Sequence, residues 1–145
     1  MNIVNKLNKA QQFLLQSRFI DADNELNKVL KKVPNNFQAL ALKSVISIKI
    51  NEKHVVIKNF KKALDNYFDL NLGLNFVQYL IENKELNLAL DINNKILTID
   101  NHNQIARLNQ AKLDIMQNSN DIAKQSKKIS KTISNTWSAW NCIYF

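Results

Sequence analysis

The scarcity of glycine and proline constrains this chain more than any other feature of its sequence. Of 145 residues, only Gly73 is a glycine and only Pro34 is a proline. Hairpins of β-strands, dinucleotide-binding crossovers and phosphate-binding loops depend on such residues for their tight turns. We therefore expect helices joined by polar turns, in a chain long enough to bury a continuous apolar core.

Apolar and polar stretches alternate with a period of about 34 residues. In the first copy, Phe13 and Phe19 flank a polar break at 16–18, apolar positions follow at three- and four-residue steps, and Pro34 ends the second helix. Further polar breaks lie at 51–53, 83–85 and 118–120. The pattern predicts a single array over 1–145, with helical hairpins at about 3–36, 37–69, 70–103 and 104–136 and an incomplete unit at 137–145.

Small and aromatic residues recur in phase with this period. They are Ala10, Phe13, Phe19, Ala22 and Pro34 in the first unit, Phe60 and Ala63 in the second, and Ala89 in the third. Small residues let helices approach closely, and aromatic residues fill the gaps between hairpins. In these positions the sequence resembles the tetratricopeptide repeat family. The resemblance implies an all-α fold, a right-handed α-α superhelix of about four such hairpins plus a partial C-terminal helix.

The resemblance also implies a binding surface, because the first helix of each unit lines the concave face of such a superhelix. The family's inner-face positions correspond here to Leu7, Gln11, Leu14, Gln38, Val45, Ile48, Leu74, Asn75, Gln78 and Ile81. Amides would bond a peptide backbone while aliphatic pockets take its side chains. The implied function is a protein–protein interaction scaffold that binds a peptide segment or mediates assembly. For any single aliphatic residue, packing under the next hairpin stays open as the alternative.

The C-terminal residues are aromatic and apolar, whereas a terminal repeat ordinarily presents a polar outer face. We expect a docking edge from Trp137, Trp140, Ile143, Tyr144 and Phe145. Either the chain is the N-terminal piece of a longer protein, or this edge docks on the preceding helices, a second copy or a partner. The first interpretation leads to an alternative function, the N-terminal array of a larger enzyme such as a glycosyltransferase or sulfotransferase, by analogy of fold alone.

The sequence shows no catalytic or metal-binding pattern. His54 and His102 lie far apart at breaks between helices, without the spacing of metal ligands, and Cys142 has no base near it in sequence. Three acidic residues in the first turns of a helix complement its dipole: Asp21, Asp23 and Glu25. We therefore expect a protein that is not an enzyme and that uses no cofactor or metal.

The net charge of +8 comes mainly from lysines spread along the chain. One stretch is basic without neighbouring acidic residues: Lys124, Lys127, Lys128 and Lys131. It lacks the arginines and interleaved aromatics of nucleic-acid platforms, so a nucleic-acid partner is not expected. A single cysteine gives no internal disulfide, and no stretch has the apolar length of a signal peptide or membrane span. A cytoplasmic location is the expectation.

Overall fold

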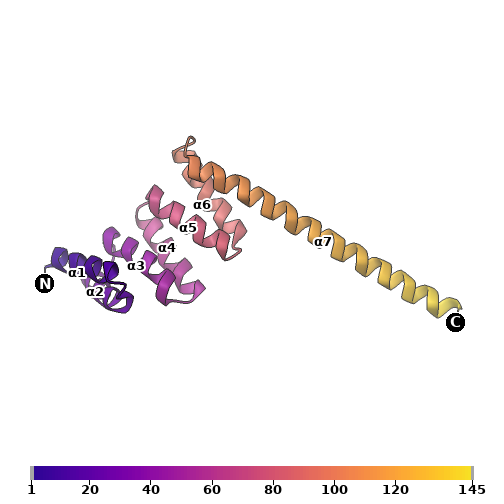
Figure 1. The fold of residues 1–145 in the computed structure, drawn as a ribbon, viewed down its shortest axis with the longest axis horizontal. Coiled ribbons are helices and arrows are strands. Elements are labelled where there is room, and N and C mark those ends of the chain that lie inside the picture. The colour runs from indigo at the N-terminus through magenta and orange to yellow at the C-terminus, as the bar shows by residue number, and fades with distance from the viewer. Residues whose placement is uncertain (1, 145) are drawn as a thin grey trace. The chain divides into compact units, whose positions relative to one another are not determined.

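The protein is an all-helical chain, as the sequence predicted. A computed structural model describes the backbone of residues 2–144 and the side chains of residues 2–132. Within that part, seven helices and no strand are present (Figure 1). They are α1 (Ile3–Leu15), α2 (Phe19–Lys32), α3 (Phe37–Ile50), α4 (Lys53–Asn66), α5 (Leu70–Glu82), α6 (Leu86–Ile99) and α7 (Gln104–Tyr144).

The predicted period is confirmed by where the odd-numbered helices begin. Helices α1, α3, α5 and α7 start at residues 3, 37, 70 and 104, at intervals of 34, 33 and 34. An Asn or Asp side chain caps the first turn of each of them, by accepting a hydrogen bond from a backbone N–H three residues on: Asn2, Asn36, Asp69 and Asn103. The even-numbered helices have no side-chain cap at their first residues. Part of the chain's high asparagine content therefore serves helix initiation.

Two of the predicted polar breaks are tight turns with the same backbone geometry. Ser17 and Lys84 adopt positive φ angles of 57° and 60° directly after α1 and α5. At the first turn, the backbone N–H of Arg18 donates to the carbonyl of Phe13 at 2.8 Å. At the second turn, the backbone N–H of Glu85 donates to the carbonyl of Leu80 at 2.9 Å. These bonds satisfy carbonyls that a helix end would otherwise leave unpaired.

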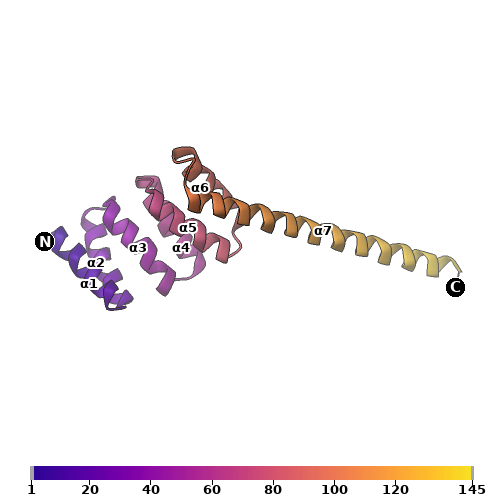
Figure 2. The same cartoon turned by 45° about the horizontal axis from the view of Figure 1, so that its top comes forward.

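The chain divides into two compact units, residues 1–76 and 77–145, with the boundary inside α5. In the first unit, α1, α2 and α3 pack around one apolar cluster (Figure 2). Its fully or almost fully buried members are Leu7, Ala10, Ala22, Leu26, Val29, Ala39 and Ile46. Alanines at these contacts keep the helices close, as the sequence pattern indicated. Phe60 of α4 stacks on Phe76 of α5, with ring centroids 4.7 Å apart.

A buried carboxylate links α1 to α2. Glu25 is 5% exposed, and its carboxylate oxygens accept hydrogen bonds of 2.8 Å from both Lys28 and Lys6. These bonds, first from Lys28 and then from Lys6, lower the pKa of Glu25 from 4.5 to about 2, against the opposing effect of burial. The sequence had indicated only a helix-dipole role for this residue, whereas the structure shows an ion-pair cluster that joins two helices.

Replacing Glu25 with Gln should lower the free energy of unfolding by roughly 1 to 2 kcal/mol at pH 7. Because the folded pKa is depressed, the contribution of Glu25 is fully present above about pH 4.5 and is lost as the pH falls toward 2. Urea unfolding of the wild type and of Glu25→Gln at pH 7, 5, 4 and 3 checks this.

Asp21→Asn is the matched control. Asp21 pairs with Arg18 at the surface, so this substitution should lower the free energy of unfolding by less than about 0.5 kcal/mol. A difference between wild type and Glu25→Gln that does not shrink with acid would contradict the assignment.

In the second unit, α7 is one continuous helix of 41 residues rather than a hairpin. The predicted turn at 118–120, and with it the fourth hairpin over 104–136 and the separate unit at 137–145, is wrong. Asn and Ser are only mildly unfavourable in a helix, and this segment contains no glycine or proline to end one. Moreover, the Ser119 hydroxyl donates to the carbonyl of Ile115 at 2.9 Å, inside the helix.

The contact between α6 and α7 combines apolar and amide side chains. Ala89 and Ile96 of α6 and Ala106 and Leu113 of α7 are fully buried. Asn93 of α6 is equally buried; its Nδ2 donates to the carbonyl of Ala106 at 2.9 Å and to Oε1 of Gln110 at 3.1 Å. These bonds cross directly from one helix to the other, so Asn93 fixes the register of the pair.

Asn93→Ala should destabilise the protein by about 1 to 2 kcal/mol, since it removes both bonds and leaves a small cavity. Asn94→Ala is the control: it changes the same residue type one position along the same helix, where the side chain is exposed. Chemical denaturation with circular dichroism measures both. Equal effects of the two substitutions would show that the buried amide does not hold α6 against α7.

Candidate functional site

The accessible surface of α1 and α3 is the candidate binding site in the first unit. Helices α1 and α3 contact each other directly, beside the contacts that α2 makes with both. Gln11 and Leu14 are one turn apart on α1, and Gln38 and Val45 are two turns apart on one side of α3. We call the set Gln11, Leu14, Gln38, Val45 and Ile48 the α1/α3 surface.

The predicted residues of this surface differ in accessibility. Gln11 and Gln38 are exposed, Val45 is 37% exposed, and Leu14 and Ile48 are half-buried. Amide groups are thus free to meet a ligand while aliphatic side chains lie beside them. Two residues of α1 add to its exposed apolar area, Val4 at 61% and Leu15 at 84%. Leu15 was not predicted, although its position four residues after Gln11 could have indicated it.

Leu7 is not available to a partner. It is 5% exposed and belongs to the apolar cluster of α1, α2 and α3. The prediction that Leu7 lines a binding face is therefore wrong. It fails because Leu7 was assigned from the family's inner-face positions, and such a position does not tell whether a neighbouring helix covers the side chain.

The four predicted residues of α5 fall on both sides of the unit boundary. In the first unit, Leu74 is half-buried and Asn75 is exposed. In the second, Ile81 is half-buried, and exposed Gln78 donates from Nε2 to Oε1 of Glu82 at 2.7 Å. The Gln78 amide is therefore already engaged within its own helix. The other group of predicted residues, the C-terminal edge of Trp137, Trp140, Ile143, Tyr144 and Phe145, lies outside the side chains that the structure describes.

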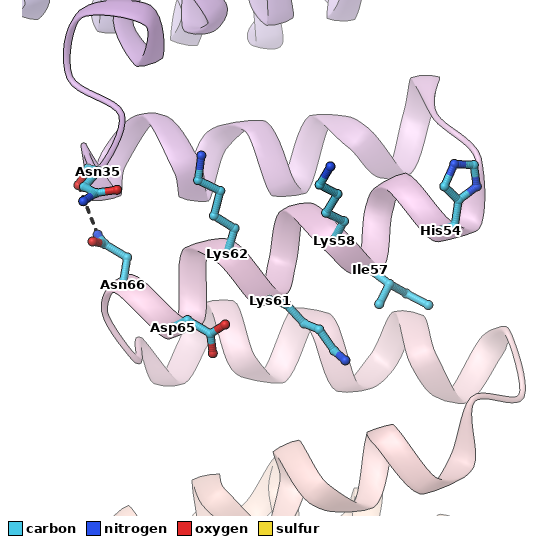
Figure 3. A pocket seen from close by; sticks show the side chains of 8 residues that line it. All are labelled: Asn35, His54, Ile57, Lys58, Lys61, Lys62, Asp65 and Asn66. Carbon is cyan, nitrogen blue, oxygen red and sulfur yellow. Dashed lines mark hydrogen bonds between the residues drawn. The ribbon is translucent and has the colours of Figure 1, made fainter.

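The outer side of α4 has a different chemistry. A shallow hollow of about 770 Å³ runs along it and is lined by Asn35, His54, Ile57, Lys58, Lys61, Lys62, Asp65 and Asn66 (Figure 3). Lys58 and Lys62 extend to the same side of the helix, and the Asn66 amide donates to the carbonyl of Asn35 at 3.1 Å at one end. The lining has several cationic groups and a single carboxylate, which favours anions in general. It has no paired acid and base of the kind that catalysis needs.

The two sides of the first unit are thus divided by charge. The exposed charged residues of α2 and α4 are Lys28, Lys31, Lys32, Lys53, His54, Lys58, Lys61, Lys62 and Asp65, whereas those of α1 and α3 are only Lys9 and Lys49. The remaining lysines of α1 and α3, Lys6 and Lys43, are partly buried in ion pairs with Glu25 and Asp23. Exposed charge in the helices of the first unit is therefore concentrated on α2 and α4, and sequence periodicity alone did not reveal this division.

Fold and surface together define a helical-repeat protein without a recognisable catalytic centre among its described residues. No group of three or more His, Cys, Asp or Glu side chains in that part of the chain is placed to hold a metal ion. None of the helices, as far as they are described, combines the length and apolarity needed to cross a bilayer. No protein-family model and no curated protein matches the sequence.

Proposed function

We propose that this chain is a tetratricopeptide-like scaffold that binds an extended peptide segment of another protein through its α1/α3 surface. The observation that carries the proposal is the division of charge in the first unit. A repeat protein of pI near 9.6 would be expected to carry lysines on all sides, yet α1 and α3 expose mainly amides and aliphatic side chains. Recurring helix starts at intervals of 33 or 34 residues support the resemblance to the family.

The chemistry of the surface selects the kind of ligand. Gln11 and Gln38 each offer a donor and an acceptor, which match the N–H and C=O groups of an extended backbone. Val45 and Leu14 offer apolar area for alternate side chains of the ligand. A ligand terminus that carries a free carboxylate would need cationic donors to offset its desolvation, and the α1/α3 surface contains none. The proposed ligand is therefore an internal, largely uncharged segment rather than a chain end.

Selection from a library of random displayed peptides on the immobilised full chain tests this proposal. Peptides enriched on the wild type should bind Val45→Glu at least about tenfold more weakly, because a carboxylate would be buried against the apolar part of the ligand. Fluorescence polarisation of the enriched peptides measures the affinities, and circular dichroism confirms that helicity is kept.

Ile20→Glu is the matched control for this experiment. Ile20 is an aliphatic residue of α2, 69% exposed, so the same change in charge is made on a helix that does not belong to the α1/α3 surface. Binding should be unaffected by it. The proposal is overturned if no peptide is enriched, or if Val45→Glu and Ile20→Glu weaken binding equally.

A further inference from the structure

Beyond Gln117, the described side chains of α7 are all exposed. Only the first part of α7 packs on α6, through Ala106, Asn109 and Leu113. Every side chain from 118 to 132 is exposed, and Figures 1 and 2 show α7 extending well past the end of α6. An isolated helix of this length is marginal in water, because most helix stability in proteins comes from packing. The segment therefore has the properties of a helix that is completed by a partner.

An apolar stripe runs along α7 on the side opposite to its contact with α6. Leu108, Ile115, Ile122 and Ile129 are spaced seven residues apart, and each is between 57% and 67% exposed. Leu108 and Ile115 follow the buried residues Ala106 and Leu113 by two positions, about 200° around a helix. The stripe therefore faces away from α6, and packing inside the second unit does not explain it.

Past Ile115, the residues one turn from the stripe are small or uncharged, whereas exposed Lys112 lies one turn from both Leu108 and Ile115. Ser119 and Ser126 lie one turn from Ile122, and Asn118 and Gln125 flank it on the other side. Of the five charged residues between 115 and 132, Lys124, Lys127 and Lys131 lie on the far side of the helix, whereas Asp121 and Lys128 directly precede Ile122 and Ile129 and lie about 100° from the stripe. A helix that packs on the stripe around Ile122 and Ile129 would therefore leave these charges outside the contact, and the serines would let it approach closely.

We propose that the stripe of Leu108, Ile115, Ile122 and Ile129 is a pairing seam for α7 of a second copy of this chain. A strict seven-residue spacing is the period at which two helices wind around each other, whereas a straight helix drifts from it by about 20° per heptad. The seam is self-complementary, because a two-fold axis places identical isoleucine and serine positions of the two copies against each other. Lys124 and Lys131 of each copy then point outward, away from the other copy.

The same geometry argues against an anionic lipid surface as the occupant. Lipid-bound helices present a broad apolar face with cationic residues at its margins. Here the stripe has one isoleucine per two turns, and Lys124 and Lys131 lie two positions from Ile122 and Ile129, on the opposite side of the helix. One flat lipid surface cannot contact both the isoleucines and these two lysines. The seam is also independent of the α1/α3 surface, so pairing and peptide binding can fail separately.

Sedimentation equilibrium of the full chain, up to about 100 µM, tests the seam. The apparent mass should rise with concentration toward twice the chain mass of 16.8 kDa. Ile122→Glu combined with Ile129→Glu should hold it near the single-chain mass, because like charges would face each other across the seam. A second variant combines Ile122→Ser with Ile129→Ser and adds no charge. It should weaken pairing as the glutamate variant does, and serine is a residue that α7 already carries nearby.

Lys124→Glu combined with Lys131→Glu is the control, with the same number of introduced carboxylates on the opposite side of α7. It should leave pairing intact. The proposal is overturned if the wild type stays monomeric, if the isoleucine variants still pair, or if the lysine control abolishes pairing. A monomeric wild type that cosediments with vesicles containing phosphatidylserine would identify a lipid surface as the occupant instead.

Discussion

The whole array depends on close contact between helices that are poor helix formers on their own. Many of their positions are asparagine, so packing rather than intrinsic propensity must stabilise them. Alanines that are almost or completely buried make this contact possible: Ala10, Ala22, Ala39, Ala63, Ala89 and Ala106. A larger side chain at any of them would push two backbones apart along their whole length, and each hairpin would lose the surface against which its neighbour folds. Small residues at fixed intervals are therefore what converts the 34-residue period into a fold.

The same packing also affects which polar and charged side chains are buried and which are exposed. Two of the buried polar side chains have partners that offset the cost of desolvation: Lys6 and Lys28 pair with Glu25, and α7 accepts hydrogen bonds from the Asn93 amide nitrogen. In the first unit, most of the exposed charged residues of the helices lie on α2 and α4. The small number of exposed charges on α1 and α3 is a property of individual side chains rather than of the fold, since packing alone would tolerate lysine at exposed Gln11 or Gln38.

Sequence reasoning succeeded where local chemistry decides the outcome. The polar triplets at 16–18 and 83–85 became turns, and the period gave the starts of α3, α5 and α7. It failed where tertiary context decides. The triplet at 118–120 resembles the others in composition. Its central residue, Ser119, nevertheless lacks the positive φ of Ser17 and Lys84, the central residues of the other two triplets, and α7 continues through it. Leu7 was misplaced for a related reason, because a position taken from the family's inner face does not show whether a neighbouring helix covers it.

The continuous α7 changes what the chain can offer to other molecules. Had the helix turned at 118–120, Ile115, Ile122 and Ile129 would have had a chance to pack against each other, as the apolar residues of the first three hairpins do. In a single helix they cannot meet, because residues seven apart lie about 10 Å from each other along the axis. Their apolar surface can be removed from water only by a second element, and their spacing specifies that this element is also a helix. A chain with so few turn-forming residues thereby acquires two surfaces of different kinds, one rich in amides along α1 and α3 and one seam of isoleucines along α7.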